Sequence, residues 1–401
     1  MSGAEHASFV MIVPMIKTQE PEVPGVTAVV VVADDLSGAC ETAAALGGLP
    51  VLLGGFDQAR PPSYAVDLST REASAAEHTA GLRHEWDALP AEATLFVKTD
   101  SLLRGHLKAT LQELVRFGRP VLFSPALPEL RRHVRAGTVE VDGVPLHQTD
   151  LWARELQPAP TSISELLGEV PHQVLGRELQ PGDLIPGQVT VCDIESPAQA
   201  DRIADIALTR GAILVGASAL ARALAVRSQA SSGPQQSLSG EASVLVVVGS
   251  AAGAAIRQLE LLCVRRGLEP VIVPTFATSG PVEAGKDGPL VALGFEAGEQ
   301  LDPELGPQLL DSLGVLVARL DRLRRRDLVL IGGETAREIL GRLGVRRLDV
   351  VREVEPGAVV SIAGERLIAT RPGSFGAEDS LLKIVDEMKS IRHDLAKGTS
   401  K

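Results

Sequence analysis

The chain has 401 residues, enough for two domains of ordinary size, and 45% of them are hydrophobic and 22% charged. This composition is typical of a folded protein and excludes disordered and collagen-like chains. The formal net charge of −12, together with only eight Phe, two Trp and one Tyr, argues against a nucleic-acid-binding surface.

No stretch of the sequence has the length and apolar character of a membrane span. The short apolar segment 9–16 is broken by Pro14 and makes a poor signal peptide. The three cysteines, Cys40, Cys192 and Cys263, are odd in number, far apart and set in apolar stretches, so we expect reduced core residues. We therefore expect a cytoplasmic protein without a membrane partner.

Apolar runs followed by helical patterns recur along the first half of the chain. Such alternation predicts an α/β fold with parallel strands, whose continuous apolar runs indicate helices on both faces of the sheet. Residues 126–190 are rich in Pro, Gly and His and resemble an irregular insertion. The predicted strand and helix pairs are 26–33 with 38–46, 93–98 with 105–117, 189–193 with 197–209, and 212–215 with 218–225.

The composition changes around residues 228–243, which are polar and rich in Ser and Gln. We take this stretch as a linker between a domain at 26–227, preceded by an extension at 1–25, and a second domain at 244–401. The sequence predicts two three-layer α/β domains with largely parallel sheets that face a central cleft. The second domain has strand-like runs at 244–248, 328–331, 359–362 and 365–369, and helical patterns at 252–266, 335–343 and 377–389.

Ligands of open α/β sheets bind at the carboxyl ends of the strands, so polar residues at those ends are candidate site residues. Asp34 and Asp35 follow the first strand, with Gly38 close behind. Two adjacent carboxylates there repel each other unless they meet a cation, a metal or substrate hydroxyls. The alternative is that Asp35 or Ser37 is simply a helix N-cap.

The segment KTDSLLRG places Lys98, Asp100, Ser101 and Arg104 after the next predicted strand. A lysine and an arginine with a hydroxyl between them can clamp a carboxylate. Alternatively, these cations pair with the two aspartates or face solvent. Asp67 and Arg71, in VDLSTREA, follow the strand-like residues 64–68, although this segment alone is also compatible with an ordinary loop.

Three glycine-containing turns in the second half are candidate phosphate-binding sites. Glycine lets backbone N–H groups approach an anion, and a helix N-terminus adds a favourable partial charge. Simple tight turns are the alternative for each of them. The turns are VVGSAAG with Ser250, IGGETA with Gly332, Gly333, Glu334 and Thr335, and RPGSFG with Gly373 and Gly376.

The order of ADDLSGA, DLSTR, KTDSLLRG, GTVEVDGVPLHQT, VVGSAAG, IGGETA and RPGSFG resembles the four-carbon acid sugar kinase family. The resemblance implies a two-domain kinase whose N-terminal domain binds a tetronate or 3-oxo-tetronate and whose C-terminal domain binds ATP. It implies transfer of the γ-phosphoryl group to the terminal hydroxyl with Mg²⁺ present, although the metal ligands stay unidentified. We expect Asp35, or alternatively Asp34, to accept the proton of the attacking hydroxyl.

The resemblance assigns further roles to the candidate residues. The substrate residues are Lys98, Asp100, Ser101, Arg104, Asp67 and Arg71, and the nucleotide residues are Ser250, Gly332, Gly333, Glu334, Thr335, Gly373 and Gly376. Departures from the family pattern at Ala252, Arg371 and Ser374 leave a non-catalytic sugar-acid sensor as an alternative. A kinase for another small hydroxy acid is a third interpretation, and a homo-oligomer is compatible with the sequence.

Overall fold

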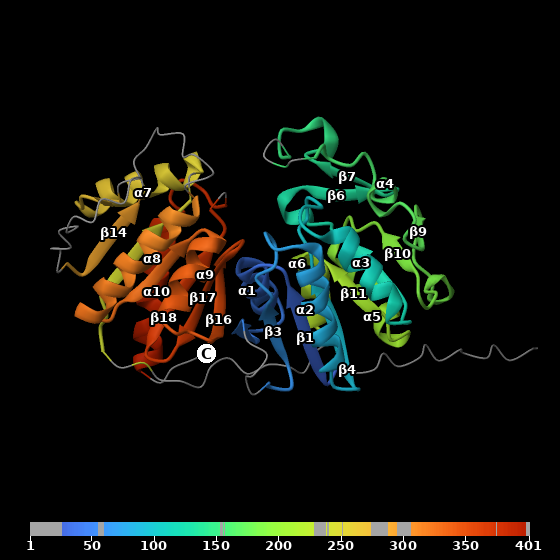
Figure 1. Cartoon of the computed structure of the whole chain (residues 1–401), viewed down its shortest axis with the longest axis horizontal. Coiled ribbons are helices and arrows are strands. Elements are labelled where there is room, and N and C mark those ends of the chain that lie inside the picture. Colours follow the sequence, from blue (N-terminus) through green and yellow to red (C-terminus); the bar gives the residue numbers. More distant parts are fainter. Residues whose placement is uncertain are drawn as a thin grey trace, which may run out of the picture.

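The computed structural model of the chain describes residues 26–54, 60–152, 155, 157–227, 238, 240–250, 252–273, 288–294, 306–373 and 375–397. The predicted extension at 1–25 and most of the predicted linker at 228–243 lie outside these residues. Strands and helices alternate through both halves, which confirms the predicted α/β class. In Figure 1 the N-terminal half runs from blue to green and the C-terminal half from yellow to red.

The N-terminal half is built on parallel strands in the spatial order β2-β3-β1-β4-β11-β5-β10-β9. Most of their side chains are apolar and buried, as expected for parallel strands with helices on both faces. The strands are β1 (Ala28–Ala33), β2 (Pro50–Leu53), β3 (Tyr64–Asp67), β4 (Ala93–Lys98), β5 (Val121–Ser124), β9 (His172–Leu175), β10 (Val189–Cys192) and β11 (Ile213–Gly216).

Helices cover this sheet on both sides and give the half three layers. Helix α2 packs against α3, while α6 packs against both α1 and α5 (Figure 1). Polar caps start several of them: Ser74 and Glu77 form a capping box before α2, for example. The helices are α1 (Leu36–Ala45), α2 (Ala75–Asp87), α3 (Leu107–Arg116), α4 (Ile163–Leu167), α5 (Pro197–Thr209) and α6 (Ser218–Ala225).

The region expected to be an irregular insertion contains a small antiparallel sheet. Its strands are β6 (Arg132–Arg135), β7 (Thr138–Val141) and β8 (Val144–Pro145), and short 3₁₀ turns flank them. The chain turns back into β6 through Arg131, whose φ of 53° is left-handed. Backbone hydrogen bonds in both directions between Leu127 and Arg132 fix that turn.

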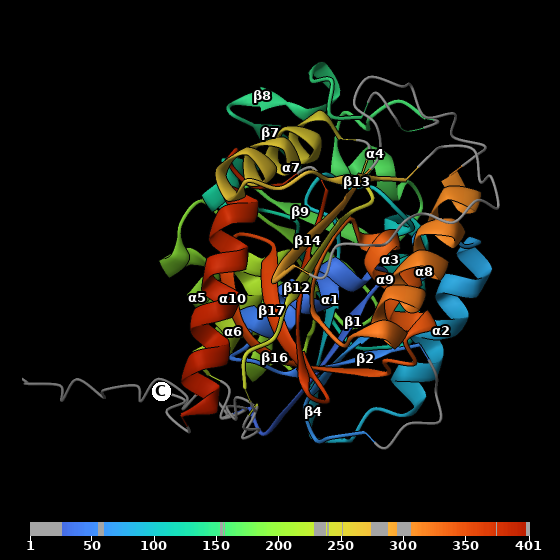
Figure 2. The same ribbon diagram turned by 90° about the vertical axis from the view of Figure 1, so that its left-hand side faces the viewer.

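The C-terminal half repeats the three-layer plan with parallel strands β13-β14-β12-β15-β18, followed by the antiparallel strands β17 and β16. Figure 2 shows α7 and α10 on one side of these strands and α8 and α9 on the other. The strands are β12 (Val244–Val248), β13 (Val271–Ile272), β14 (Leu290–Gly294), β15 (Asp327–Ile331), β16 (Arg347–Glu355), β17 (Ala358–Ala363) and β18 (Arg366–Arg371). The helices are α7 (Gly253–Arg266), α8 (Gly306–Leu323), α9 (Gly333–Arg342) and α10 (Ser380–Ala396).

The two halves join edge to edge, which the sequence did not predict. Strand β16 pairs antiparallel with β2, with Arg347 opposite Leu52 and Asp349 opposite Pro50. All these strands therefore form one 15-stranded sheet. Helix α1 packs against β16 and β17 as well as against β3, so it also connects the halves.

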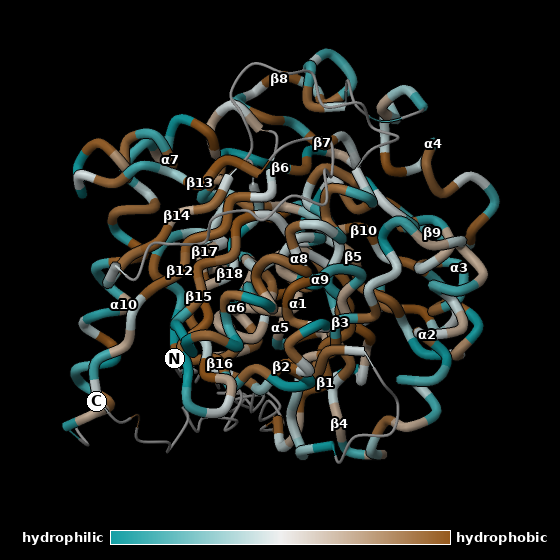
Figure 3. The backbone as a smooth tube through the Cα atoms, turned by 60° about the vertical axis from the view of Figure 1, so that its left-hand side comes forward, coloured by the Kyte–Doolittle hydropathy of each residue, from teal (hydrophilic) through white to brown (hydrophobic). Residues whose placement is uncertain are grey.

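The core follows the strands through both halves. In Figure 3 the central strands are coloured as hydrophobic, and the residues of β1 and β12 are buried along their whole length. Cys40, Cys192 and Cys263 are buried and form no disulfide. Within the described part of the chain, no helix combines the length and the hydropathy that crossing a bilayer requires.

Candidate functional site

A cavity of about 800 Å³ lies between the two halves. Its lining comes from residues that follow β1, β3 and β4 on one side, and from α8, α9 and the segment after β18 on the other. Because β1 pairs with both β3 and β4, the carboxyl ends of these three strands meet at one edge. Asp35 and Gly333, which the sequence assigned to opposite domains, share this one opening.

Asp34 and Asp35 share one arginine. Arg71 Nε lies 3.1 Å from Asp34 Oδ2, and Arg71 Nη1 lies 2.6 Å from Asp35 Oδ2. Burial raises the pKa of Asp34 above its usual value, although the charge of Arg71 opposes the shift. Asp35 Oδ1 also accepts a hydrogen bond from the Gly38 amide at 2.5 Å, so Asp35 caps α1 as well. Asp35 is therefore both the N-cap of α1 and a residue of the cavity lining.

Lys98 and Arg104 reach the cavity already paired with carboxylates. Lys98 Nζ lies 3.5 Å from Glu41 Oε2. Arg104 presents Nε and Nη2 to the two oxygens of Asp100, at 2.8 and 2.9 Å. Burial opposes ionisation of Asp100, but the hydrogen bonds and charge of Arg104 hold its pKa well below the usual range. The carboxylate clamp expected from Lys98 and Arg104 stays a prediction.

Ser101 contacts a cation that the sequence analysis did not select. The buried Ser101 hydroxyl accepts a hydrogen bond from Arg132 Nη1 at 2.6 Å, and both residues line the cavity. Arg132 is the first residue of β6, in the stretch expected to be irregular. The available signal was that this arginine ends the segment PALPELRR (125–132), which comes directly after β5.

Asp67 forms an ion pair across the two halves. It ends β3, its side chain is 1% exposed, and its Oδ2 lies 3.2 Å from Arg337 Nη1 on α9. Its Oδ1 accepts a hydrogen bond from the Ser69 amide at 2.7 Å, whereas Oδ2 accepts none from the part of the chain that the structure describes. Burial raises the pKa of Asp67 to about 7, even though the charge of Arg337 lowers it. Arg337 also lay outside the predicted site.

The glycine turns of the second half meet because they follow neighbouring strands. β15 pairs with both β12 and β18, so Ser250, Gly332 and Gly373 lie at adjacent strand ends. A Cβ on Gly373 would overlap the Ser250 side chain, and one on Gly249 would overlap Thr335. Gly332 has a left-handed φ of 111°. The turns are therefore packed closely enough to require glycine at these places.

Two helix N-termini from different halves meet in the cavity. Helix α9 begins at Gly333, and no side chain caps it. A Cβ on Gly333 would lie 3.3 Å from Ser37 Oγ at the start of α1. Backbone N–H groups at helix N-termini carry a partial positive charge that favours anions. Glu334 also lines the cavity, where burial and the charge of Glu72 raise its pKa.

Some predicted nucleotide residues lie next to the cavity instead of in its lining. Gly333, Glu334 and Gly373 line it, whereas Ser250, Gly332, Thr335 and Gly376 are set behind them. Arg371, at the end of β18, is buried, and its guanidinium donates to Gln258 Oε1 at 2.5 Å. The Arg371 side chain and Gly376 are thus in the packing beneath α10. Ser374 lies outside the described residues.

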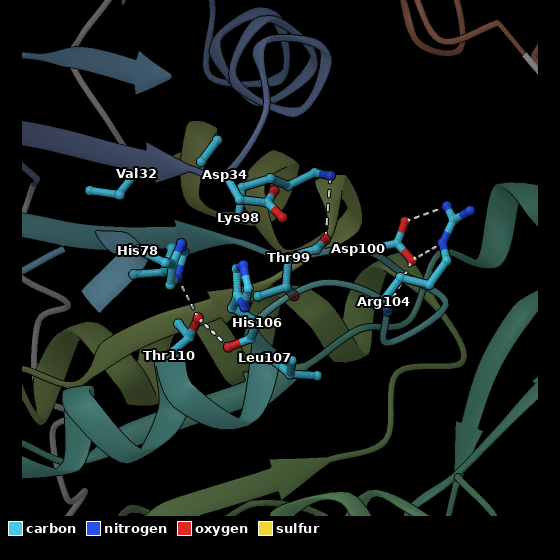
Figure 4. Close-up of a pocket in the computed structure, with 12 residues that line it drawn as sticks. Val32, Asp34, His78, Lys98, Thr99, Asp100, Arg104, His106, Leu107 and Thr110 are labelled. Atoms are coloured by element: carbon cyan, nitrogen blue, oxygen red, sulfur yellow. Dashed lines mark hydrogen bonds and ion pairs between the residues drawn. The ribbon is translucent and has the colours of Figure 1, made fainter. Parts of the chain in front are cut away.

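A second, small pocket is lined by Asp34 and Asp100 and, farther inside, by His78 and Thr110 (Figure 4). The Nδ1 atom of His78 is 2.7 Å from Thr70 Oγ1, and its Nε2 atom is 2.8 Å from Thr110 Oγ1. Burial, and to a smaller extent His106, lower the pKa of His78 to about 4. The imidazole is therefore neutral at pH 7, and it supports the loop that carries Arg71.

Comparison with known proteins covers both halves. One family model, described as a sugar-binding N-terminal domain, matches residues 29–224, and another, a nucleotide-binding C-terminal domain, matches 292–381. A D-threonate kinase of Cupriavidus necator is 30% identical over 403 residues, which cover 88% of this chain and 95% of that protein. The chain belongs to the four-carbon acid sugar kinase family. It is therefore a sugar-acid kinase with a nucleotide-binding C-terminal domain.

One more curated relative and two solved structures are also similar to this chain. A 3-oxo-tetronate kinase of Burkholderia multivorans is 33% identical over 114 residues, 28% of this chain and 24% of that protein. A solved structure from Salmonella typhimurium LT2 superposes with a TM-score of 0.72 at 18% identity, over 90% of this chain and 99% of that one. One from Haemophilus influenzae gives 0.68 at 16% identity, over 90% and 100%. These two structures share the fold.

Proposed function

We propose that this kinase transfers the γ-phosphoryl group of ATP to the terminal hydroxyl of a four-carbon sugar acid, a tetronate or a 3-oxo-tetronate. One observation carries the proposal: a single cavity is lined by the charged cluster after β1, β3 and β4 and by the uncapped start of α9. As part of this proposal, residues 26–227 form the domain that binds the sugar acid, and residues 244–401 form the domain that binds the nucleotide. The activities for which the two kinase relatives are named support the substrate class.

The phosphate end of ATP is assigned to the start of α9. The Gly333 backbone faces the cavity with no competing side-chain cap, and Gly373 lies on its rim. Phosphoryl transfer needs positioning and charge neutralisation more than covalent chemistry, and backbone N–H groups at a helix N-terminus supply both. The turns of Ser250 and Gly332 support this surface from behind.

Asp35 is assigned as the proton acceptor. Its side chain is 23% exposed against 11% for Asp34, and it stands at the start of α1, opposite α9. Arg71 and the Gly38 amide hold its two oxygens in place. Asp35 takes the hydroxyl proton as the substrate oxygen bonds to the γ-phosphorus. The bond from that phosphorus to the β,γ-bridging oxygen breaks, and ADP leaves.

The acidic lining is compatible with Mg²⁺ brought in by ATP. Among the described residues no group of three or more Asp, Glu, His or Cys side chains is arranged to hold a metal ion. Mg²⁺ usually needs only one or two carboxylates in addition to phosphate oxygens, so the residues present fit it. We assign Glu334, beside the start of α9, as the carboxylate that would hold it. Bound there, Mg²⁺ supplies neutralisation of phosphate charge.

The test is a measurement of ADP release by the purified protein with Mg²⁺, ATP and a panel of threonates, erythronates and 3-oxo-tetronates. We expect turnover of at least one acid, with the new phosphate on the terminal oxygen by ³¹P NMR. Asp35→Asn should lower kcat by about 10²–10⁴-fold, the contribution of a general base. The exposed Asp142→Asn, at a side chain 52% exposed, is the matched control and should not change it. Absence of turnover with the whole panel would contradict the proposal.

A further inference from the structure

Among the described residues, one basic side chain of the cavity has no carboxylate as an ion-pair partner. Five basic side chains line the cavity among the described residues, and four of them form ion pairs within the protein. These four are Arg71 with Asp34 and Asp35, Lys98 with Glu41, Arg104 with Asp100, and Arg337 with Asp67. The fifth is Arg132.

Arg132 is held in place without its charge being balanced. Its Nη1 donates to the Ser101 hydroxyl at 2.6 Å, while its Nε is buried and meets no acceptor in the described part of the chain. The two-way backbone hydrogen bonding with Leu127 fixes the start of β6. Burial lowers the pKa of Arg132, and the nearby charges of Asp100 and Glu41 oppose this shift without forming an ion pair with the guanidinium. A partly buried guanidinium with spare donors is costly unless an anion meets it.

We propose that Arg132, together with Ser101, binds the carboxylate of the substrate, and this proposal rests on the proposed function. The planar guanidinium presents two parallel N–H groups that match a carboxylate. Lys98 and Arg104 then keep the cluster electrically balanced and hold Asp100 and Glu41 in place.

The assignment also orients the substrate. Ser101 follows β4, whereas Asp35 follows the neighbouring strand β1 and faces the start of α9. Adjacent strands are about 4.8 Å apart, which is comparable to the length of a four-carbon chain. An acid whose carboxylate lies on Arg132 therefore directs its far hydroxyl toward Asp35 and the phosphate site. The structure thus favours a short acid phosphorylated at the end opposite its carboxylate.

The test compares Arg132→Gln with Arg131→Gln, its neighbour on the same turn. Arg131 is 77% exposed and pairs with Asp142, so it is a matched control. Arg132→Gln should raise KM for the acid about 10- to 150-fold, because a hydrogen bond to a charged group contributes about 1.5–3 kcal/mol. KM for ATP should not change. The wild type should prefer the acid over its neutral amide, and in Arg132→Gln this preference should be smaller by the same factor.

Several outcomes would overturn the assignment: an unchanged KM for the acid in Arg132→Gln, an equal loss in Arg131→Gln, or an unchanged preference for acid over amide. If Arg132→Gln fails to fold by circular dichroism, Arg132→Lys decides, since it keeps the charge and loses the fork. A raised KM for the acid alone then supports the assignment, and an unchanged KM overturns it. If the wild type turns over no acid, the proposed function fails. Calorimetric binding of threonate to wild type and variant, without ATP, still tests Arg132.

Discussion

The ion pair between Asp67 and Arg337 connects the two halves, and its removal should have a pH-dependent effect on stability. The Asp67 side chain is 1% exposed and that of Arg337 30%. Arg337→Met would leave the buried carboxylate with the Ser69 amide as its only hydrogen-bond donor among the described residues. Breaking a buried pair costs about 3–5 kcal/mol. Because the pKa of Asp67 is about 7, protonation of the unpaired carboxyl limits this cost near neutral pH, and we expect Arg337→Met to lose about 1 kcal/mol more of the free energy of unfolding at pH 8 than at pH 5.

The same substitution should have little effect in mild acid. Burial raises the pKa of Asp67 from 3.8 to about 7 in the folded protein. Between these values the folded state binds more protons than the unfolded state, so this group lowers stability as the pH rises. At pH 5 the folded carboxyl is protonated, and Arg337 has no negative charge to meet. We therefore expect Arg337→Met to cost under about 1 kcal/mol at pH 5.

Urea unfolding followed by circular dichroism at pH 5 and pH 8 measures both values. The control is Arg342→Met on the same helix, where the arginine pairs with Glu338 and Asp311 at the surface. This control should lose about 1 kcal/mol or less, with no pH dependence of this kind. In an Asp67→Asn background, Arg337→Met should lose its effect at pH 8. A loss that is equal at both pH values, or that persists in the Asp67→Asn background, would refute the reasoning.

Two further predictions concern the glycine turns and the buried histidine. Gly373→Ala should weaken ATP binding about tenfold or more by calorimetry, since its Cβ overlaps Ser250 and overpacking costs about 1–3 kcal/mol. Gly341→Ala, whose Cβ meets open space, is the control, and unchanged affinity in Gly373→Ala would contradict the prediction. The pKa of His78, lowered from 6.5 to about 4, makes stability fall by up to about 3 kcal/mol as the pH drops through that window. His78→Gln should reduce that fall in urea unfolding, and an unchanged pH profile would count against it.

Local patterns in the sequence were sufficient for many of the elements. The strands predicted at 93–98 and 244–248 and the helices at 197–209 and 218–225 have the observed bounds. Apolar runs and helix-starting residues determine such elements locally, whatever the rest of the chain does. Short strands such as β2 and β5 were missed because a run of three or four apolar residues does not distinguish a strand from a buried helix segment.

The pairing of β16 with β2 could not be predicted in the same way. These strands lie far apart in the sequence, and neither carries a local signal for its partner. Their edge-to-edge contact depends on how the two halves pack around α1. The sequence predicted two sheets that face a cleft; the structure also joins these sheets through β16 and β2, and the cavity lies at the carboxyl ends of the strands.

In the candidate site, too, some features could be predicted from the sequence and others depend on the folded structure. Strand patterns alone were enough to place Asp34, Asp67 and Asp100 at strand ends, and parallel strands bring such ends to one edge of the sheet. Which charges pair with each other, and that Arg132 has no ion-pair partner among the described residues, follow from how the folded chain brings its segments together. Ion pairing depends on distances of a few ångströms between distant segments, and strand and helix patterns contain no information about those distances.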